Sequence, residues 1–173
     1  IYKRKSSFIV SARRSTPFIF NLSDINYHFY DLNAKLNFEI SPKDKIFISF
    51  FKGNDGLRIQ QNNEIAKNKL ISKWGNTLFS FRWNRVYNNK LFGNLTLSGT
   101  QYHFNNNFDF NGQNDTTKTV IKSKINTGIT DLILKKEFTY SPSSIIKFKF
   151  GAQSTYHIFK PNEQSYFYST NNQ

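Results

Sequence analysis

The sequence predicts an all-β protein, an antiparallel up-and-down meander of about seven strands. Three observations predict it. Apolar and polar residues alternate with a period of two along most of the chain, the connections alternate between long and short, and aromatic residues gather at strand ends. No stretch shows the 3.6-residue period of an amphipathic helix.

The clearest strand is the segment 30–40, in which every second residue is apolar from Tyr30 to Ile40. Such alternation places the apolar side chains on one face of a β-strand and the polar ones on the other. The segment 145–159 follows the same rule, and the remaining strands follow it less regularly. We expect strands at 5–14, 27–41, 45–55, 74–87, 91–104, 122–140 and 145–159.

The connections between these strands are of two kinds that alternate along the chain. Short, turn-like segments stand at 41–44, 88–90 and 141–144, and long polar segments stand at 15–26, 56–73 and 105–121. A transmembrane β-barrel has tight turns on one side of the membrane and long loops on the other. The expected strands also have the 9–11 residues or more that a tilted crossing needs. The pattern therefore favours a transmembrane barrel over a soluble sheet.

Aromatic residues stand near both ends of the expected strands. Those near the long connections are Tyr30, Trp74 and Tyr156, and those near the short turns are Phe38, Tyr87 and Tyr140. Two such girdles mark the two water–lipid boundaries of an outer-membrane barrel. We expect one convex, lipid-facing surface that carries Leu32, Leu36, Phe79, Phe81, Trp83, Leu95, Phe148 and Phe150.

The opposite set of side chains is charged. It includes Asp31 and Glu39, and a dry core does not accept so many charges because each unpaired one costs several kcal/mol. A wide polar lumen accepts them. The cations expected to face this lumen are Lys35, Arg82, Lys147 and Lys149.

Composition argues against several other functions. The formal net charge is +13, but the Lys and Arg residues are scattered, so we predict no nucleic-acid partner. Cysteine is absent, which excludes disulfides, thiolate metal sites and a cysteine nucleophile. His28, His103 and His157 lie far apart, and neither a G-x-S-x-G motif nor a glycine-rich phosphate loop occurs. We therefore expect no enzyme, no metal site and no cofactor.

Four segments resemble the barrel of TonB-dependent outer-membrane receptors: SFIVSARR (7–14), YHFYDLNAKLNFEISPKDKIFISFFKGND (27–55), WGNTLFSFRWNRVYNNKLFGNLTLSGTQYHF (74–104) and IKFKFGAQSTYHIFKP (146–161). The most specific part is WGN followed by RWN on one strand and then a short turn. The resemblance implies a 22-stranded barrel in the outer membrane of a Gram-negative bacterium. An N-terminal domain plugs such a barrel, and the TonB complex energises import of a scarce nutrient: an iron chelate, cobalamin or a glycan.

About seven strands are a part of such a barrel, so we expect residues 1–173 to be a barrel fragment without its plug. Its partners would be outer-membrane lipid, the plug, the TonB complex and the nutrient. Open edges are then expected at 5–14 and 145–159. Ligand capture would use the long loops, with Arg58, Gln60, Gln61, Asn62, Asn63, Phe108 and Asp109 as candidates.

Two other interpretations remain open. One is a small complete outer-membrane barrel with a structural or adhesive role. The other is a soluble, lipocalin-like binding protein, whose inner face would be mostly apolar.

Overall fold

The computed structural model describes residues 5–15, 24–113 and 117–171, which form eight strands in one sheet. The strands are β1 (Ser6–Arg14), β2 (Ile25–Ser41), β3 (Asp44–Asn62), β4 (Ala66–Asn88), β5 (Leu91–Gln113), β6 (Thr117–Tyr140), β7 (Phe148–Lys160) and β8 (Glu163–Asn171).

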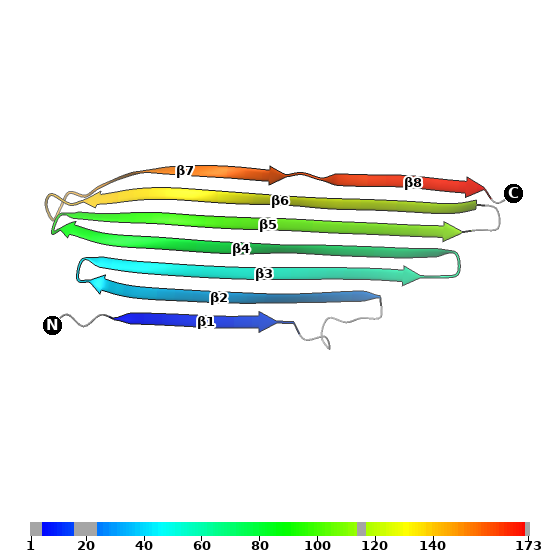
Figure 1. Ribbon diagram of the computed structural model, residues 1–173, viewed down its shortest axis with the longest axis horizontal. Coiled ribbons are helices and arrows are strands. Elements are labelled where there is room, and N and C mark those ends of the chain that lie inside the picture. The colour runs from blue at the N-terminus through cyan, green and yellow to red at the C-terminus, as the bar shows by residue number, and fades with distance from the viewer. Residues whose placement is uncertain (1–4, 16–23, 114–116, 172–173) are drawn as a thin grey trace.

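The strands form an antiparallel meander in the order β1-β2-β3-β4-β5-β6-β7, as the sequence predicts. β8 follows β7 after a break at Pro161 and Asn162, and it pairs with the outer half of β6. Figure 1 shows β7 and β8 end to end along β6, with β1 at the opposite edge of the sheet. Within the described residues β1 and β7 do not pair, so the sheet is open.

Short side chains close the tight turns at both ends of the sheet. Asn88 Oδ1 accepts hydrogen bonds from the backbone N–H groups of Lys90 and Leu91 at 2.9 and 3.0 Å. At the other end, Asn63 Oδ1 accepts from Ile65 and Ala66 at 3.2 and 2.6 Å. Asn favours turns because its side chain replaces a backbone acceptor.

The structure corrects two of the expected long loops. Residues 56–62 and 66–73 continue β3 and β4, and only 63–65 lie between them. Residues 105–113 likewise belong to β5, and 117–121 belong to β6. The third expected loop, 15–26, includes residues 16–23, which lie outside the described residues. The short connections are confirmed, although the last one extends to residue 147.

Strand register assigns each side chain to one of two faces, which we name after two neighbouring residues of β4. The Trp83 face includes Leu36, Ile48, Phe81 and Leu97, which are cross-strand partners in one row. The Arg82 face carries the residues between them. The eight apolar residues assigned to one face by the sequence all lie on the Trp83 face.

An apolar band crosses the Trp83 face from β1 to β7, beside the short turns. On β2 it runs from Tyr30 to Ile40, about 33 Å along the strand at ~3.3 Å per residue. At a barrel tilt of about 40° this length spans about 25 Å, the height of the lipid-facing band in outer-membrane barrels. Its exposed members include Phe8, Val10, Leu32, Phe79, Leu97, Leu132, Leu134, Phe148, Phe150 and Tyr156.

The sheet is a single layer without a hydrophobic core in its described part. No apolar side chain there is buried, and even Leu36, Phe81, Trp83 and Leu95 are only half-buried. The accessible surface is 12951 Å², whereas a folded monomer of this mass exposes about 8,800 Å². Apolar side chains of the band, which a packed soluble monomer would bury, are therefore exposed.

In the outer half of the sheet, away from the short turns, the apolar residues lie mainly on the Arg82 face and the polar residues mainly on the Trp83 face. On β3 the apolar residues of the band have even numbers, such as Ile48 and Phe50, and those farther out have odd numbers, such as Leu57 and Ile59. The outer halves of β4, β5 and β6 change in the same way, and their Arg82 face carries Leu70, Trp74, Phe104, Phe108, Phe110, Ile121 and Ile125. No helix in the described part of the chain is long and apolar enough to cross a membrane.

Candidate ligand-binding surface

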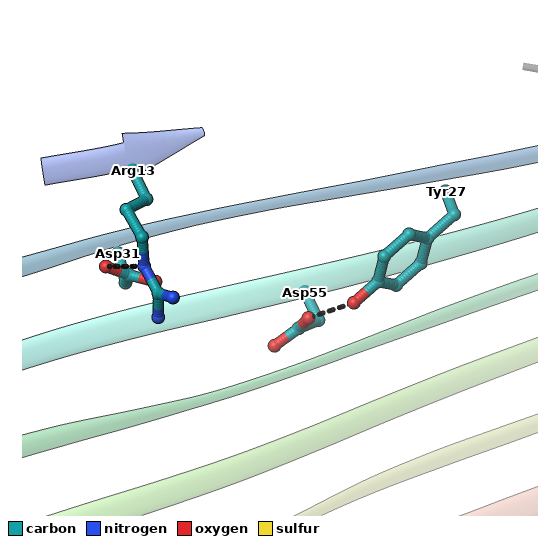
Figure 2. Close-up of polar contacts among 4 residues, drawn as sticks. All are labelled: Arg13, Tyr27, Asp31 and Asp55. Carbon is teal, nitrogen blue, oxygen red and sulfur yellow. Dashed lines mark hydrogen bonds and ion pairs between the residues drawn. The ribbon is translucent and has the colours of Figure 1, made fainter. Parts of the chain in front are cut away.

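Ion pairs lie mainly on the Arg82 face. Arg13 Nη2 lies 2.7 Å from Asp31 Oδ2, and Arg13 Nε also donates to both carboxylate oxygens at 2.9 and 3.1 Å (Figure 2). Two further ion pairs lie on this face, Lys45–Glu39 between β3 and β2 and Lys135–Glu137 within β6. His157 Nδ1 lies 2.7 Å from Asp131 Oδ1, and this contact is an ion pair when the imidazole is protonated. Paired opposite charges suit a sheet face in contact with water.

Three of the four cations predicted for one face of the sheet lie on one face. Lys35, Arg82 and Lys149 all lie on the Arg82 face, and the Arg82 guanidinium lies 4.6 Å from the centre of the Phe47 ring. Lys147 precedes β7 and belongs to no strand, so its assignment to a strand face is wrong. The physical reason is the longer connection after Tyr140, which delays pairing until Phe148.

The outer half of the Arg82 face carries five rings from β2, β4 and β5, which we call the aromatic wall: Tyr27 of β2, Trp74 of β4, and Phe104, Phe108 and Phe110 of β5. Tyr27 and Trp74 have ring centres 6.5 Å apart. Trp74 and Phe104 are direct cross-strand partners. The predicted outer girdle is corrected here, because Trp74 lies on the face opposite Tyr30 and Tyr156.

Polar groups are fixed beside these rings. The Tyr27 hydroxyl donates a hydrogen bond to Asp55 Oδ1 (Figure 2), and this bond, with partial burial, raises the pKa of Tyr27. In the next row the Ser72 hydroxyl donates to Asn106 Oδ1 at 2.5 Å. Rings beside a few oriented polar groups are the composition of small-ligand sites. The wall can stack the apolar faces of a sugar or chelate, while its carboxylate and amides contact hydroxyl groups.

The predicted capture residues are divided between the two faces. Gln61 and Phe108 lie on the Arg82 face, and Phe108 belongs to the aromatic wall. Asn63 holds the turn described above. The remaining candidates lie on the Trp83 face: Arg58, Gln60, Asn62 and Asp109. The sequence predicts all seven candidates in two loops, 56–73 and 105–121, whereas strand alternation distributes those on β3 and β5 over both faces.

Sequence reasoning missed most of the wall. The sequence predicts no binding role for the rings of Tyr27 and Phe104, or for the neighbouring polar residues Asp55 and Ser72. The signal in the sequence that could have found the wall is the change of the apolar positions along each strand, from even to odd numbers on β3 and from odd to even numbers on β5.

A hollow of about 610 Å³ lies on the Trp83 face beyond the apolar band, where β2, β3 and β4 meet. Its lining includes Asp24, His28, Arg58 and Lys73, with Gly56 among them. A Cβ at Gly56 would lie 2.3 Å from His28 Cε1, so glycine is needed for the ring to lie over the strand. Arg58 Nη2 donates to Gln60 Oε1 at 2.6 Å at this hollow.

The three histidines do not converge. His28 and His103 lie on the Trp83 face of β2 and β5, and His157 lies on the opposite face beside Asp131. Among the described residues, no three His, Cys, Asp or Glu side chains are grouped as a metal site requires.

No family model matches this chain, and no curated protein matches it either.

Proposed function

We propose that this chain forms part of the barrel of a TonB-dependent receptor in the outer membrane of a Gram-negative bacterium. In this proposal the Trp83 face contacts lipid and the Arg82 face lines the lumen. The receptor imports a scarce nutrient, an iron chelate, cobalamin or a glycan. The plug and the TonB complex are its partners in the complete receptor.

The single observation that carries the proposal is the apolar band on a sheet without a core. Exposed side chains such as Phe79, Leu132 and Phe150 form one strip of the height that a bilayer requires. Lipid is the solvent that accepts such a strip without a second protein layer. The open sheet and its meander topology agree with a sector of a large barrel and offer no support for a complete eight-stranded barrel.

The aromatic wall supports a capture role for the lumen side of the outer half. It lies beyond the band, at the end of the sheet where a ligand from outside would arrive. Its rings are held on strands rather than on mobile loops, which favours a preformed site. We assign capture to Trp74, Phe104 and Phe108, with Asp55 and Asn106 as hydrogen-bonding partners.

The two tryptophans offer a direct test, because Trp83 lies in the band and Trp74 lies on the opposite face. Two single-tryptophan variants, Trp74→Phe and Trp83→Phe, are placed in vesicles with brominated acyl chains, which quench only rings in contact with them. The remaining Trp83 should be quenched strongly and the remaining Trp74 weakly.

Equal quenching of both tryptophans, or of neither, contradicts the membrane assignment. A soluble lipocalin-like protein gives the second result. Circular dichroism of both variants, which should keep the strand signal, shows that folding is not the cause of a difference.

A further inference from the structure

Strand alternation places the cations of the outer half of the sheet on one face only. On the Arg82 face, this half begins beyond the row formed by Asp31, Gly53, Asn76 and Tyr102. Farther out on that face, no described strand residue is Lys, Arg or His. The cations of the same strand segments lie on the Trp83 face: Arg58, Lys67, Lys69, Lys73, Lys118, Lys122, Lys124 and Lys160. A ligand on the aromatic wall therefore meets no cationic side chain from these strand segments.

The charged groups on the same side as the wall are carboxylates. Asp55 lies in one row with Trp74 and Phe104, and its Oδ1 accepts the hydrogen bond of the Tyr27 hydroxyl (Figure 2). Glu163 of β8 lies on this face at the edge of the sheet. An anion that leaves water beside carboxylates, with no cation to pair with it, is strongly disfavoured. The electrostatics of the wall therefore select against anionic ligands.

The nutrient classes considered above differ in charge. Carboxylate and catecholate chelates of iron(III) are anionic, and cobalamin carries a phosphodiester. An unsubstituted oligosaccharide is neutral, and its hydroxyl groups can donate hydrogen bonds to the Asp55 carboxylate and to amide oxygens such as that of Asn106. Its C–H faces suit the aromatic side chains that line small-ligand sites. Charge therefore favours a neutral glycan over the other two classes.

The shape of the wall favours an extended ligand. Phe104, Phe108 and Phe110 lie on one face of β5, and the first and last are six residues apart, about 20 Å along the strand. The rings of Tyr27 and Trp74, with centres 6.5 Å apart, widen the wall toward β2. A compact chelate covers one part of this surface, whereas a linear chain of several sugar units contacts its whole length.

We propose that the aromatic wall binds a linear, uncharged oligosaccharide along β5 and discriminates against anionic chelates. The rings stack on the sugar units, and Asp55 accepts hydrogen bonds from their hydroxyl groups. This inference rests on the proposed function, because it takes the Arg82 face to be the lumen that the ligand enters. It deepens that function by selecting one nutrient class and by assigning the selection to the absence of cations.

The test uses the purified chain in detergent, with Trp83→Phe so that Trp74 is the only tryptophan. The first probes are neutral linear hexasaccharides of glucose, mannose or galactose units. The hexasaccharide that binds most tightly is then oxidised at its primary alcohols to carboxylates, which gives an acidic probe of the same length. Ferric citrate is the anionic chelate. Binding is measured by calorimetric titration and, for the sugars, by the change in Trp74 emission.

At least one neutral hexasaccharide should bind and change the emission of Trp74. Its oxidised form should bind at least about tenfold more weakly, a loss of about 1.4 kcal/mol, and ferric citrate should not bind. Failure of every neutral hexasaccharide to bind overturns the proposal. Binding of the acidic probe or of ferric citrate as tightly as the neutral one overturns it as well.

Two lysine variants test whether charge is the cause. Asn76 is exposed on the Arg82 face, two residues from Trp74, and Gln101 is exposed on the Trp83 face of the next strand. Asn76→Lys should bind the acidic probe more tightly than the parent protein, and Gln101→Lys should not. Equal binding of the acidic probe by the two variants contradicts selection by charge. Circular dichroism, with the strand signal unchanged, shows that both variants are folded.

The two proposals can fail separately. Absence of Trp83 quenching by brominated lipid removes the membrane assignment, whatever the sugar result. Normal quenching together with equal binding of the neutral and acidic probes removes only the choice of a neutral glycan.

Discussion

The indole N–H of Trp83 donates a hydrogen bond to the carboxylate of Asp44 at 3.0 Å. The bond joins β4 to the turn between β2 and β3, where Asp44 also accepts from the Ser41 hydroxyl at 2.8 Å and faces Arg85 at 3.7 Å. The apolar ring of Trp83 thus lies in the band, and its polar N–H lies at the border of the band next to the short turns. This is the position that indole prefers at a water–lipid interface.

The first prediction concerns the pH dependence of this turn. The Ser41 hydroxyl, the Trp83 N–H and the charges of Arg85 and Lys43 hold the pKa of Asp44 below its usual range, against an opposing effect of burial. A lowered pKa in the folded state adds stability above the unfolded pKa of about 4, and this contribution is lost as the pH falls through the folded value. Wild type should therefore exceed Asp44→Asn in thermal stability by a constant margin from about pH 5 to 7.

Thermal unfolding in detergent, followed by circular dichroism from about pH 2 to 7, measures this margin. It should shrink below about pH 4. A margin that grows as the pH falls contradicts the assigned direction of the pKa shift.

The second prediction concerns close contacts at glycine. A Cβ at Gly75 would lie 2.7 Å from the backbone oxygen of Gly53 and 2.6 Å from His103 Cε1, so the strand itself must move. We expect Gly75→Ala to lower the free energy of unfolding by about 1–3 kcal/mol. Gly99→Ala is the control, because its nearest neighbour would be Leu132 Cδ2 at 3.5 Å. Equal midpoints for both variants in a urea titration would show that the Gly75 contact has no effect.

The third prediction concerns the two edges of the sheet. Cysteine is absent from the sequence, so introduced pairs report proximity without background. Ala12→Cys/Leu32→Cys joins cross-strand partners of β1 and β2 and should form a disulfide on mild oxidation. The variant Val10→Cys/Ala152→Cys places one cysteine on β1 and one on β7, and these two should not form a disulfide. Efficient cross-linking of the second pair would support a small closed barrel instead.

The fourth prediction concerns the aromatic wall. Removing the rings of Phe104 and Phe108 deletes stacking area without altering the Trp83 face. In the proposed receptor, the double alanine variant should therefore reduce nutrient uptake by cells at least about tenfold if each ring contributes about 1 kcal/mol. Surface abundance should be unchanged. Asn105→Ala, on the opposite face of the same strand, should retain uptake. Equal uptake by all three proteins would exclude the wall from ligand capture.

The sequence predicted the meander and the inner half of every long strand because the alternation there is regular. On each strand the apolar residues of the band stand at every second position. Polar residues flank Leu32, Phe81 and Leu97 on both sides. The sequence predicts loops in place of the outer halves because, there, the apolar residues change from even to odd positions or the reverse, and polar residues predominate at the point of change. In β3 the segment 52–56 (KGNDG) has no large apolar side chain, and such a break in alternation is indistinguishable from a strand end. Only pairing with neighbouring strands shows that the backbone continues.

The candidate site was predictable only in part for the same reason. Residue type alone predicts a binding role for Phe108 and Gln61, whereas the position of Trp74 near a strand end predicts a girdle residue. A girdle and a lumen wall use the same aromatic residues and differ only in the face they occupy. Register decides the face, and a shift of one residue moves every side chain to the other side.

The meander has a consequence for how such a sheet changes during evolution. Each strand from β1 to β7 pairs with its neighbours in sequence, and β6 pairs in addition with β8. Among the described residues, no buried apolar side chain from a distant strand completes a core. Loss of the hairpin formed by β4 and β5 would place β3 beside β6 in the antiparallel direction, with the short turns still at one end. The natural unit of duplication or deletion is therefore a pair of strands with its turn. Genes for such sheets can lengthen or shorten by whole hairpins while each remaining strand keeps its own pattern of alternation.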